Sequence, residues 1–305
     1  MVKGIVMKTG VLKGSILIAL GAASYGMLGT FVKLAYLDDF STAEVTVSQF
    51  LLGFVILFVL SFFGNRKKGS ESKSLGIKSI LKLTVAGSSL GLTSIFYYMA
   101  VQYISVGVAI VLLMQTVWMG VVLEMFLQKK IPSARKIVAV FVILAGTVLA
   151  THLLSDSVNI NWPGFGWGIL AAVTYTATMY TSNNLELHFP PLKRSLFLIL
   201  GGLIIILLIF HTSLNREFSM NIFSSWGLLV SLFGTVIPPL LFTRGMPLTG
   251  IGLGAIIASI EIPVALLTAN ILLKEPVSLV QWVGVLLILL AMALMNIGAK
   301  KETAL

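Results

Sequence analysis

The sequence predicts an all-α integral membrane protein with ten transmembrane helices, arranged as two inverted repeats of five. Ten apolar stretches follow one another, and about 20 helical residues cross the ~30 Å hydrocarbon core of a bilayer. Hydrophobic residues make up 57% of the 305 residues and charged residues 10%, and the mean hydropathy is +1.02. These runs lack the alternation of barrel strands, so helices are the expected way to satisfy the backbone in lipid.

The first repeat is expected to occupy residues 1–152 and the second residues 153–305. The first apolar run follows a basic N-terminus, as a signal peptide would, but it lacks a small-x-small cleavage site, so we expect a retained helix. The expected spans of the first repeat are 11–36, 43–64, 77–101, 104–127 and 132–151. Those of the second are 163–184, 194–212, 223–243, 249–273 and 277–299.

Positive charge lies mostly on one side of the predicted membrane. With the N-terminus inside, 18 of the 21 Lys and Arg residues are internal, and only Lys33, Arg216 and Lys274 are external. This bias predicts cytoplasmic N- and C-termini and a location in the cell inner (plasma) membrane. The net charge of +10 suits contact with anionic lipid heads. The basic residues are spread over separate segments, so nucleic acid is not an expected partner.

Several kinds of chemistry have no support in the sequence. There are no cysteines, which excludes disulfides, thiolate metal sites and a cysteine nucleophile. His152, His188 and His211 lie at three different loop edges, so no metal site is expected. The G-x-x-x-x-G-K-[ST] phosphate loop is absent, so the chain has no ATP cycle of its own. We expect no cofactor and no catalytic residues.

A repeat underlies the apolar pattern. A shift of 145 residues aligns the fourth and fifth spans with the ninth and tenth, including Lys129 with Lys274 and Ser133 with Ser278. A shift of 150 aligns Tyr25 with Tyr175. Because five spans is an odd number, the second repeat enters the membrane in the opposite orientation. Inverted repeats of this kind build two gates around a site near the midplane, as an alternating-access carrier requires.

The chain resembles the drug/metabolite transporter superfamily, and specifically its EamA-like branch. The best-matching segments are Leu241–Gly250, Ala255–Val264, Leu272–Pro276 and the Q-x-x-G motif Gln281–Gly284. The family often places its glutamate directly before the ninth-helix proline, whereas Glu261 stands two residues before Pro263. In the first repeat Trp118 takes the proline position, so that half of the signature has decayed. The resemblance implies a ten-helix carrier with a central cavity, but no particular substrate.

Glu261 is the leading candidate for the substrate site. It lies near the middle of the ninth span, where an ionised side chain costs about 2.5–3.5 kcal/mol on insertion scales. It should therefore face the bundle interior. Two roles stay open: a contact with a substrate amine or a coupled proton, and a structural carboxyl that joins two helices.

Other polar and aromatic residues are secondary candidates. Gln115 and Thr116 lie at the matching depth of the fourth span, and Tyr25 and Tyr175 form a pair across the repeats. Trp118 would narrow the same cavity or simply pack. Aromatic walls with a few polar groups suit a small-molecule site, although buried tyrosines also serve as packing. Tyr97, Tyr98 and Gln102 of the third span suit an interfacial aromatic belt.

Arg244 and Lys33 are weaker candidates for a gate or an anion contact. Arg244 ends the eighth span and also suits snorkelling to lipid heads. Lys33 lies near acidic residues that are able to pair with it, Asp38 among them. Glu124 is expected to pair with Lys129 or with a neighbouring basic loop.

The leading functional prediction is a secondary transporter for a small organic metabolite, an amino acid or a similar zwitterionic or cationic solute, with export as one possible direction. Glu261 and the lack of Lys or Arg in the deepest spans favour such a solute over a phosphorylated one. The alternatives are a passive facilitator or channel of the same fold and, less favoured, a membrane-embedded lipid-modifying enzyme. The sequence leaves the oligomeric state open.

Overall fold

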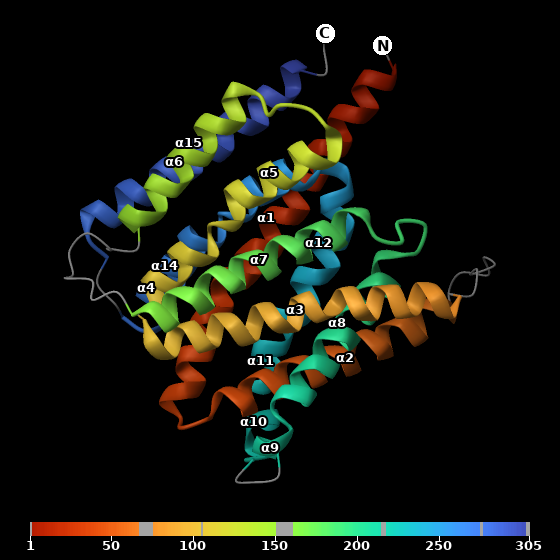
Figure 1. Cartoon of the computed structure of the whole chain (residues 1–305), viewed down its shortest axis with the longest axis vertical. Coiled ribbons are helices and arrows are strands. Elements are labelled where there is room, and N and C mark those ends of the chain that lie inside the picture. The colour runs from red at the N-terminus through yellow and green to blue at the C-terminus, as the bar shows by residue number, and fades with distance from the viewer. Residues whose placement is uncertain are drawn as a thin grey trace.

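The structure is a computed structural model that describes residues 2–66, 76–104, 106–150, 161–214, 218–274 and 277–302. Within these ranges the chain is helical (Figure 1). The first half contains α1 (Val2–Leu37), α2 (Thr42–Arg66), α3 (Ile77–Tyr103), α4 (Val106–Leu113), α5 (Thr116–Gln128) and α6 (Ala134–Ala150). The second contains α7 (Trp162–Asn184), α8 (Pro191–Ile209), α9 (His211–Leu214), α10 (Asn221–Ser224), α11 (Gly227–Ser231), the π-helix η1 (Leu232–Val236), α12 (Ile237–Thr249), α13 (Ile251–Ala258), α14 (Glu261–Leu272) and α15 (Leu279–Glu302).

The helices correspond to the ten expected spans, with shifted limits in the second half. Among the described residues, seven helical stretches are long and apolar enough to cross a membrane, and α6, α7 and α15 stand in the places of the other three spans. The seventh expected span becomes α8 and starts at Pro191 instead of 194, and the eighth extends to Thr249 instead of 243. The repeat boundary at 152, His152 and Arg216 lie outside the described residues.

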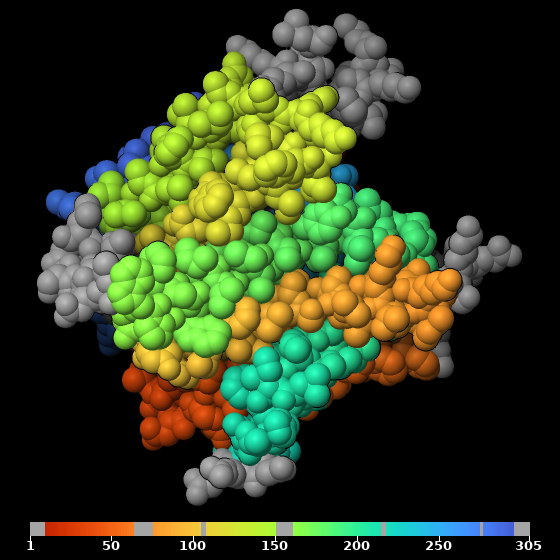
Figure 2. Space-filling model, viewed as in Figure 1, coloured from red at the N-terminus to blue at the C-terminus, as the bar shows by residue number. Residues whose placement is uncertain are grey.

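The two halves pack against each other in matching pairs. Helix α1 packs on α12 and α14, and its counterpart α7 packs on α3 and α4. The last helices of the halves, α6 and α15, lie side by side and antiparallel, since Gln281 at the start of α15 donates to the Ala150 carbonyl at the end of α6 (Figure 1). Figure 2 shows α7 in green between α3 in orange and the yellow α4–α5 segment. Each half therefore completes its packing with the other.

The fourth and ninth spans are both broken, at positions that the 145-residue shift makes equivalent. The first break separates α4 from α5 at Met114 and Gln115, and the second separates α13 from α14 at Ser259 and Ile260. Each break is a tight turn, with Gln115 N–H donating to the Leu112 carbonyl and Ser259 N–H to that of Ile256. Broken helices at membrane depth are a feature of transporter binding sites.

Side chains satisfy carbonyl groups at these breaks. The Gln115 amide donates to the Val111 carbonyl at 3.0 Å, and the Ser259 hydroxyl donates to that of Ile256 at 2.7 Å. Pro263 lacks the N–H that would bond the Ser259 carbonyl, and Ile262 supplies a donor instead at 3.2 Å. The first break forms without a proline, so proline is not what produces it.

The eighth span contains a π-helical turn between α11 and α12. Two prolines, Pro238 and Pro239, follow it and lack the donors that a regular helix would use. The Thr235 hydroxyl lies 2.8 Å from the carbonyls of both Ser231 and Gln49, and the Ser24 hydroxyl donates to the Phe233 carbonyl at 2.9 Å. These contacts tie the wide turn to α1 and α2.

Glycines allow α3 and α8 to touch along their backbones. A Cβ on Gly87 would overlap the Leu198 carbonyl, and one on Gly201 would overlap the Thr84 carbonyl. Gly91 faces Gly202 in the same way. Small residues let membrane helices approach closely, so this contact is a rigid part of the bundle.

The outer surface is apolar and part of the interior is polar, as expected for a protein in lipid. Phe141 and Leu208 are 69% and 64% exposed, whereas Gln49 is 1% exposed. The Arg194 side chain, which the sequence suggests as a loop charge, is buried at the start of α8. Its guanidinium donates to the carbonyls of Leu185, Thr243 and Ser182 at 2.9, 2.8 and 2.6 Å.

Candidate functional site

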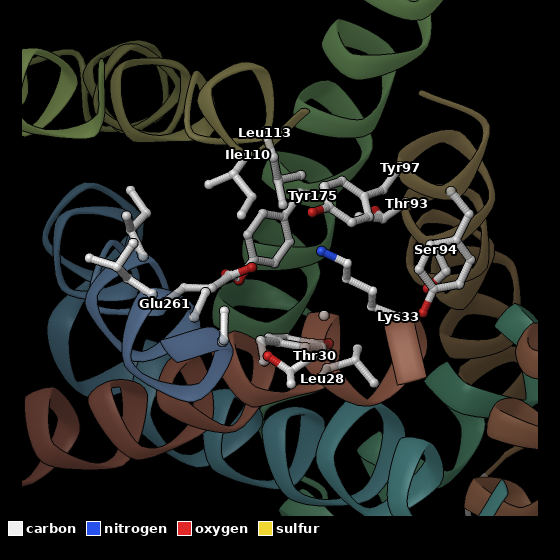
Figure 3. Close-up of a pocket in the computed structure, with 18 of the residues that line it drawn as sticks. Leu28, Thr30, Lys33, Thr93, Ser94, Tyr97, Ile110, Leu113, Tyr175 and Glu261 are labelled. Atoms are coloured by element: carbon white, nitrogen blue, oxygen red, sulfur yellow. Dashed lines mark hydrogen bonds between the residues drawn. The ribbon is translucent and has the colours of Figure 1, made fainter. Parts of the chain in front are cut away.

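A cavity of about 270 Å³ lies between helices from both halves of the protein. Helices α1, α3, α4, α7 and α14 line it (Figure 3). It extends from Tyr25, Tyr175 and Glu261 to Lys33 and Gln281, which lie toward the end of the molecule opposite the chain termini. Its size suits a small organic solute, because small-molecule pockets begin at a few hundred Å³.

Glu261 and two tyrosines form the inner end of the cavity. The Tyr175 hydroxyl donates to Glu261 Oε2 at 3.3 Å. The Tyr25 ring meets the Tyr175 ring edge-on, with centroids 6.0 Å apart, and it also packs against Phe242. Glu261 is the first residue of α14, directly after the break, so the break sets the depth of its carboxylate.

One face of α1 forms another wall of the cavity. Gly26, Gly29, Thr30 and Lys33 follow the three- and four-residue spacing of a helix face and all line the cavity. A Cβ on Gly26 would lie 2.5 Å from the Glu261 carbonyl oxygen, so α1 and α14 are in backbone contact there. A Cβ on Gly29 would meet nothing within 4 Å, so Gly29 faces open space.

Hydroxyl groups line the α3 and α7 side. Thr93 donates to the Thr174 hydroxyl at 3.0 Å, and the hydroxyls of Ser89 and Thr178 lie 2.9 Å apart. Thr93 and Thr178 both reach the cavity lining, as do Ser94 and Tyr97. On the α14 side, Thr30 and Thr268 join α1 to α14 with hydroxyls 3.1 Å apart.

The structure brings together four of the eight residues that the sequence proposes for the site. Tyr25, Tyr175, Glu261 and Lys33 line the same cavity. The other four residues do not line it. Trp118 Nε1 donates to Gln115 Oε1 at 2.9 Å, and the Thr116 hydroxyl of α5 lies 2.8 Å from that of Thr176 in α7. Arg244 is exposed on α12.

Lys33, a weak candidate from the sequence, and Tyr97, which the sequence did not propose for the site, both line the cavity. Tyr97 was expected in an interfacial belt, and Lys33 was expected either as a gate or anion contact or as a partner of the nearby acidic residues Asp38, Asp39 and Glu44. Of these, Asp38 accepts a hydrogen bond from Trp226 Nε1 at 2.7 Å, and Glu44 accepts bonds from Ser41 and Ser219. The spacing of Lys33 from Gly26 and Gly29 on one helix face is the signal that would have placed it.

An ion pair lies at the other end of the bundle, near the chain termini. Lys136 in the first turn of α6 contacts Glu124 of α5, so Glu124 pairs with a basic residue just beyond the connecting loop and not with Lys129. Glu124 is 8% exposed and also accepts from Gln128 at 3.4 Å. Its carboxylate adjoins Gly250 and Gly252 at the N-terminus of α13, where the helix dipole favours negative charge.

The described residues contain no group of three or more His, Asp or Glu side chains placed to hold a metal ion. The site is therefore best described as a cavity with one carboxylate, one ammonium group and several hydroxyls.

Comparisons with known proteins agree with this architecture. The sequence profile of the EamA-like transporter family matches residues 12–152 and again residues 162–297. No curated protein sequence matches the chain. One solved structure, titled only "Crystal structure of protein", superposes with a TM-score of 0.75 at 15% identity, over 96% of this chain and 99% of that chain, which shows a shared fold. With two family matches that together cover most of its length, the chain is a multi-pass membrane protein of the EamA-like transporter family, and it is not an enzyme.

Proposed function

We propose that the protein is a secondary transporter that moves a small organic solute, an amino acid or a similar zwitterionic or cationic metabolite, through the central cavity. The observation that carries this proposal is the position of Glu261. Its carboxylate lies in a cavity shared by both repeats, at the first residue after a helix break. A carboxylate at this depth binds an amine or carries a proton.

Alternating access around this cavity explains why the two repeats are similar. Equivalent breaks at Gln115 and Ile260 give each repeat a hinged helix beside the cavity. Opening toward one side and then the other requires two such gates related by inversion. With the basic residues facing the cytoplasm, the chain termini are internal in the plasma membrane, and the cavity lies toward the external face.

Uptake into proteoliposomes tests the proposal. Purified protein is screened with labelled amino acids and nucleosides, with and without an imposed pH gradient. Accumulation above equilibrium that requires the gradient supports a proton-coupled carrier, whereas equilibration that ignores the gradient indicates a passive facilitator. Failure to move any compound of the panel contradicts the proposed solute class.

Glu261→Gln tests the role of the carboxylate. The substitution keeps the shape of the side chain and removes its charge. We expect at least a tenfold loss of uptake driven by the pH gradient. Asp39→Asn is the matched control, because Asp39 lies outside the cavity lining and Asn tolerates its positive φ of 63°. Full gradient-driven uptake by Glu261→Gln would contradict the proposed role.

A further inference from the structure

The cavity contains opposite charges on facing helices. Lys33 belongs to α1 and Glu261 to α14, and both side chains line the same space. Figure 3 shows the Lys33 ammonium directed into the cavity, on the side of Tyr175 and Tyr97. Lys33 is exposed in spite of lying within a membrane helix, so the space that it enters is accessible to solvent.

The spacing of the two charges follows from helix geometry. Gly26 is in backbone contact with Glu261, and Lys33 lies seven residues further along α1. Seven residues rise about 10 Å, and helical side chains tilt back toward the N-terminus. The Lys33 side chain therefore extends back toward the level of Glu261. The gap between the two charged groups is therefore smaller than the separation of the two residues along the backbone.

Small and hydroxyl-bearing residues surround this gap. Gly29 on α1 and Ala265 on α14 leave the space between the charges open. On the Lys33 side, Ser94 and Tyr97 of α3 place hydroxyl groups in the cavity lining. An ammonium group with neighbouring hydroxyls is suited to a carboxylate, while the carboxylate of Glu261 is suited to an amine.

We propose that Lys33 binds the carboxylate of the transported solute and makes the site selective for zwitterions over amines with the same side chain. This inference rests on the proposed transport through the cavity. A zwitterion places its amine at Glu261 and its carboxylate at Lys33, so both charges of the protein are matched. An amine that lacks the carboxylate brings a second positive charge close to Lys33 and is repelled.

Matched pairs of solutes test this selectivity. Leucine, phenylalanine and threonine are each compared with the amine that remains when the carboxylate is removed: isoamylamine, phenethylamine and 1-aminopropan-2-ol. Uptake is measured in proteoliposomes for the wild type, Lys33→Gln, Lys33→Arg and Lys82→Gln. Lys82 is the control because its side chain is 66% exposed and pairs with Glu186, away from the cavity.

We expect the wild type to prefer at least one amino acid over its amine by tenfold or more. Lys33→Gln should lose most of that preference while still transporting the amine, which shows that the variant is folded. Lys33→Arg should retain the preference, since it keeps the positive charge, and so should Lys82→Gln.

The outcomes separate this inference from the transport proposal. A tenfold preference that survives in Lys33→Gln, or a wild type that takes up amines as readily as amino acids, overturns the role of Lys33 and leaves transport standing. Uptake of no probe by the wild type overturns both the zwitterion site and the proposed transport of such solutes.

Discussion

Arg194 directs its buried guanidinium to backbone carbonyl oxygens at the end of α7 and to Thr243 of α12. One side chain at the start of α8 thus holds α7 and α12 by hydrogen bonds. Bonds from a charged donor contribute about 1.5–3 kcal/mol each, and a buried acceptor left without a donor adds a further cost. The residue therefore acts as a junction inside the bundle, where the sequence suggested only a topology charge.

We expect Arg194→Met to lower the free energy of unfolding by about 2–4 kcal/mol, since it removes several buried donors at once. Unfolding in mixed detergent micelles measures the change. Arg244→Met is the matched control, because Arg244 is exposed on α12 and its loss should cost less than about 0.5 kcal/mol. Equal effects of the two substitutions would contradict the junction role.

At the same scale, the sequence identified some site residues and missed others for a physical reason. Glu261 could be identified from the sequence because placing a carboxyl group in an apolar span costs free energy. Tyr25 and Tyr175 could be identified because the 150-residue shift aligns them. Hydropathy reports the depth of a residue but not the direction in which its helix face points. Tyr97 was therefore assigned to the membrane surface and Lys33 was only a weak candidate, although both residues line the cavity.

At the scale of elements, the sequence predicted the number and order of helices but not their interruptions. Apolar runs such as 104–127 and 249–273 read as continuous, and only the structure shows the breaks after α4 and α13. The π-turn in the eighth span was equally hidden. A tight or wide turn changes the hydrogen-bond pattern without changing the polarity of the side chains, so hydropathy contains no signal for it.

The ion pair between Glu124 and Lys136 joins α5 and α6 at the N-terminus of α13. We expect Glu124→Gln to loosen this end of the bundle. The chain has no cysteine, so one introduced at Met246, which is fully buried, is the only target for a water-soluble maleimide. Labelling of Met246→Cys should rise severalfold when Glu124→Gln is added.

Lys129→Gln is the control for this experiment, because Lys129 is an exposed basic residue of the same connection. It should leave the labelling rate unchanged. An equal increase with Lys129→Gln, or no increase with Glu124→Gln, would show that the ion pair does not close this end.

At the scale of the whole molecule, the two gates that the proposed alternating access requires would be unequal. The 145-residue shift places Ala269 where the first repeat has Glu124, and Gln281 where it has Lys136. Both residues line the cavity, toward the end opposite the termini. Among the described residues the ion pair is therefore present in the first repeat and has no counterpart at the equivalent positions of the second.

Transferring the pair to the second gate tests this asymmetry. We expect the double substitution Ala269→Glu and Gln281→Lys to close the cavity from the far end. A cysteine introduced at Gly29, which faces open space, reports access to the cavity. Its labelling by a water-soluble maleimide should fall severalfold in the double variant and not with Gln281→Lys alone. Unchanged labelling would argue against a role for charge in closing this gate.

A carrier in which one closed gate is more stable than the other has different transport kinetics at its two faces. When only a fraction of the molecules is open to a face, the apparent affinity for solute at that face falls by that fraction. Each 1.4 kcal/mol by which the closed conformer is favoured changes the population ratio about tenfold. Because the ion pair closes the end near the termini, the conformer that is open to the opposite face is favoured. Solute at that opposite face therefore half-saturates transport at a lower concentration than solute at the face where the termini lie. If transport is uncoupled, the maximal rates must differ by the same factor, because a passive carrier cannot build a gradient. The protein would move solute from the face opposite the termini with high apparent affinity and a low maximal rate, and in the other direction with low apparent affinity and a high maximal rate.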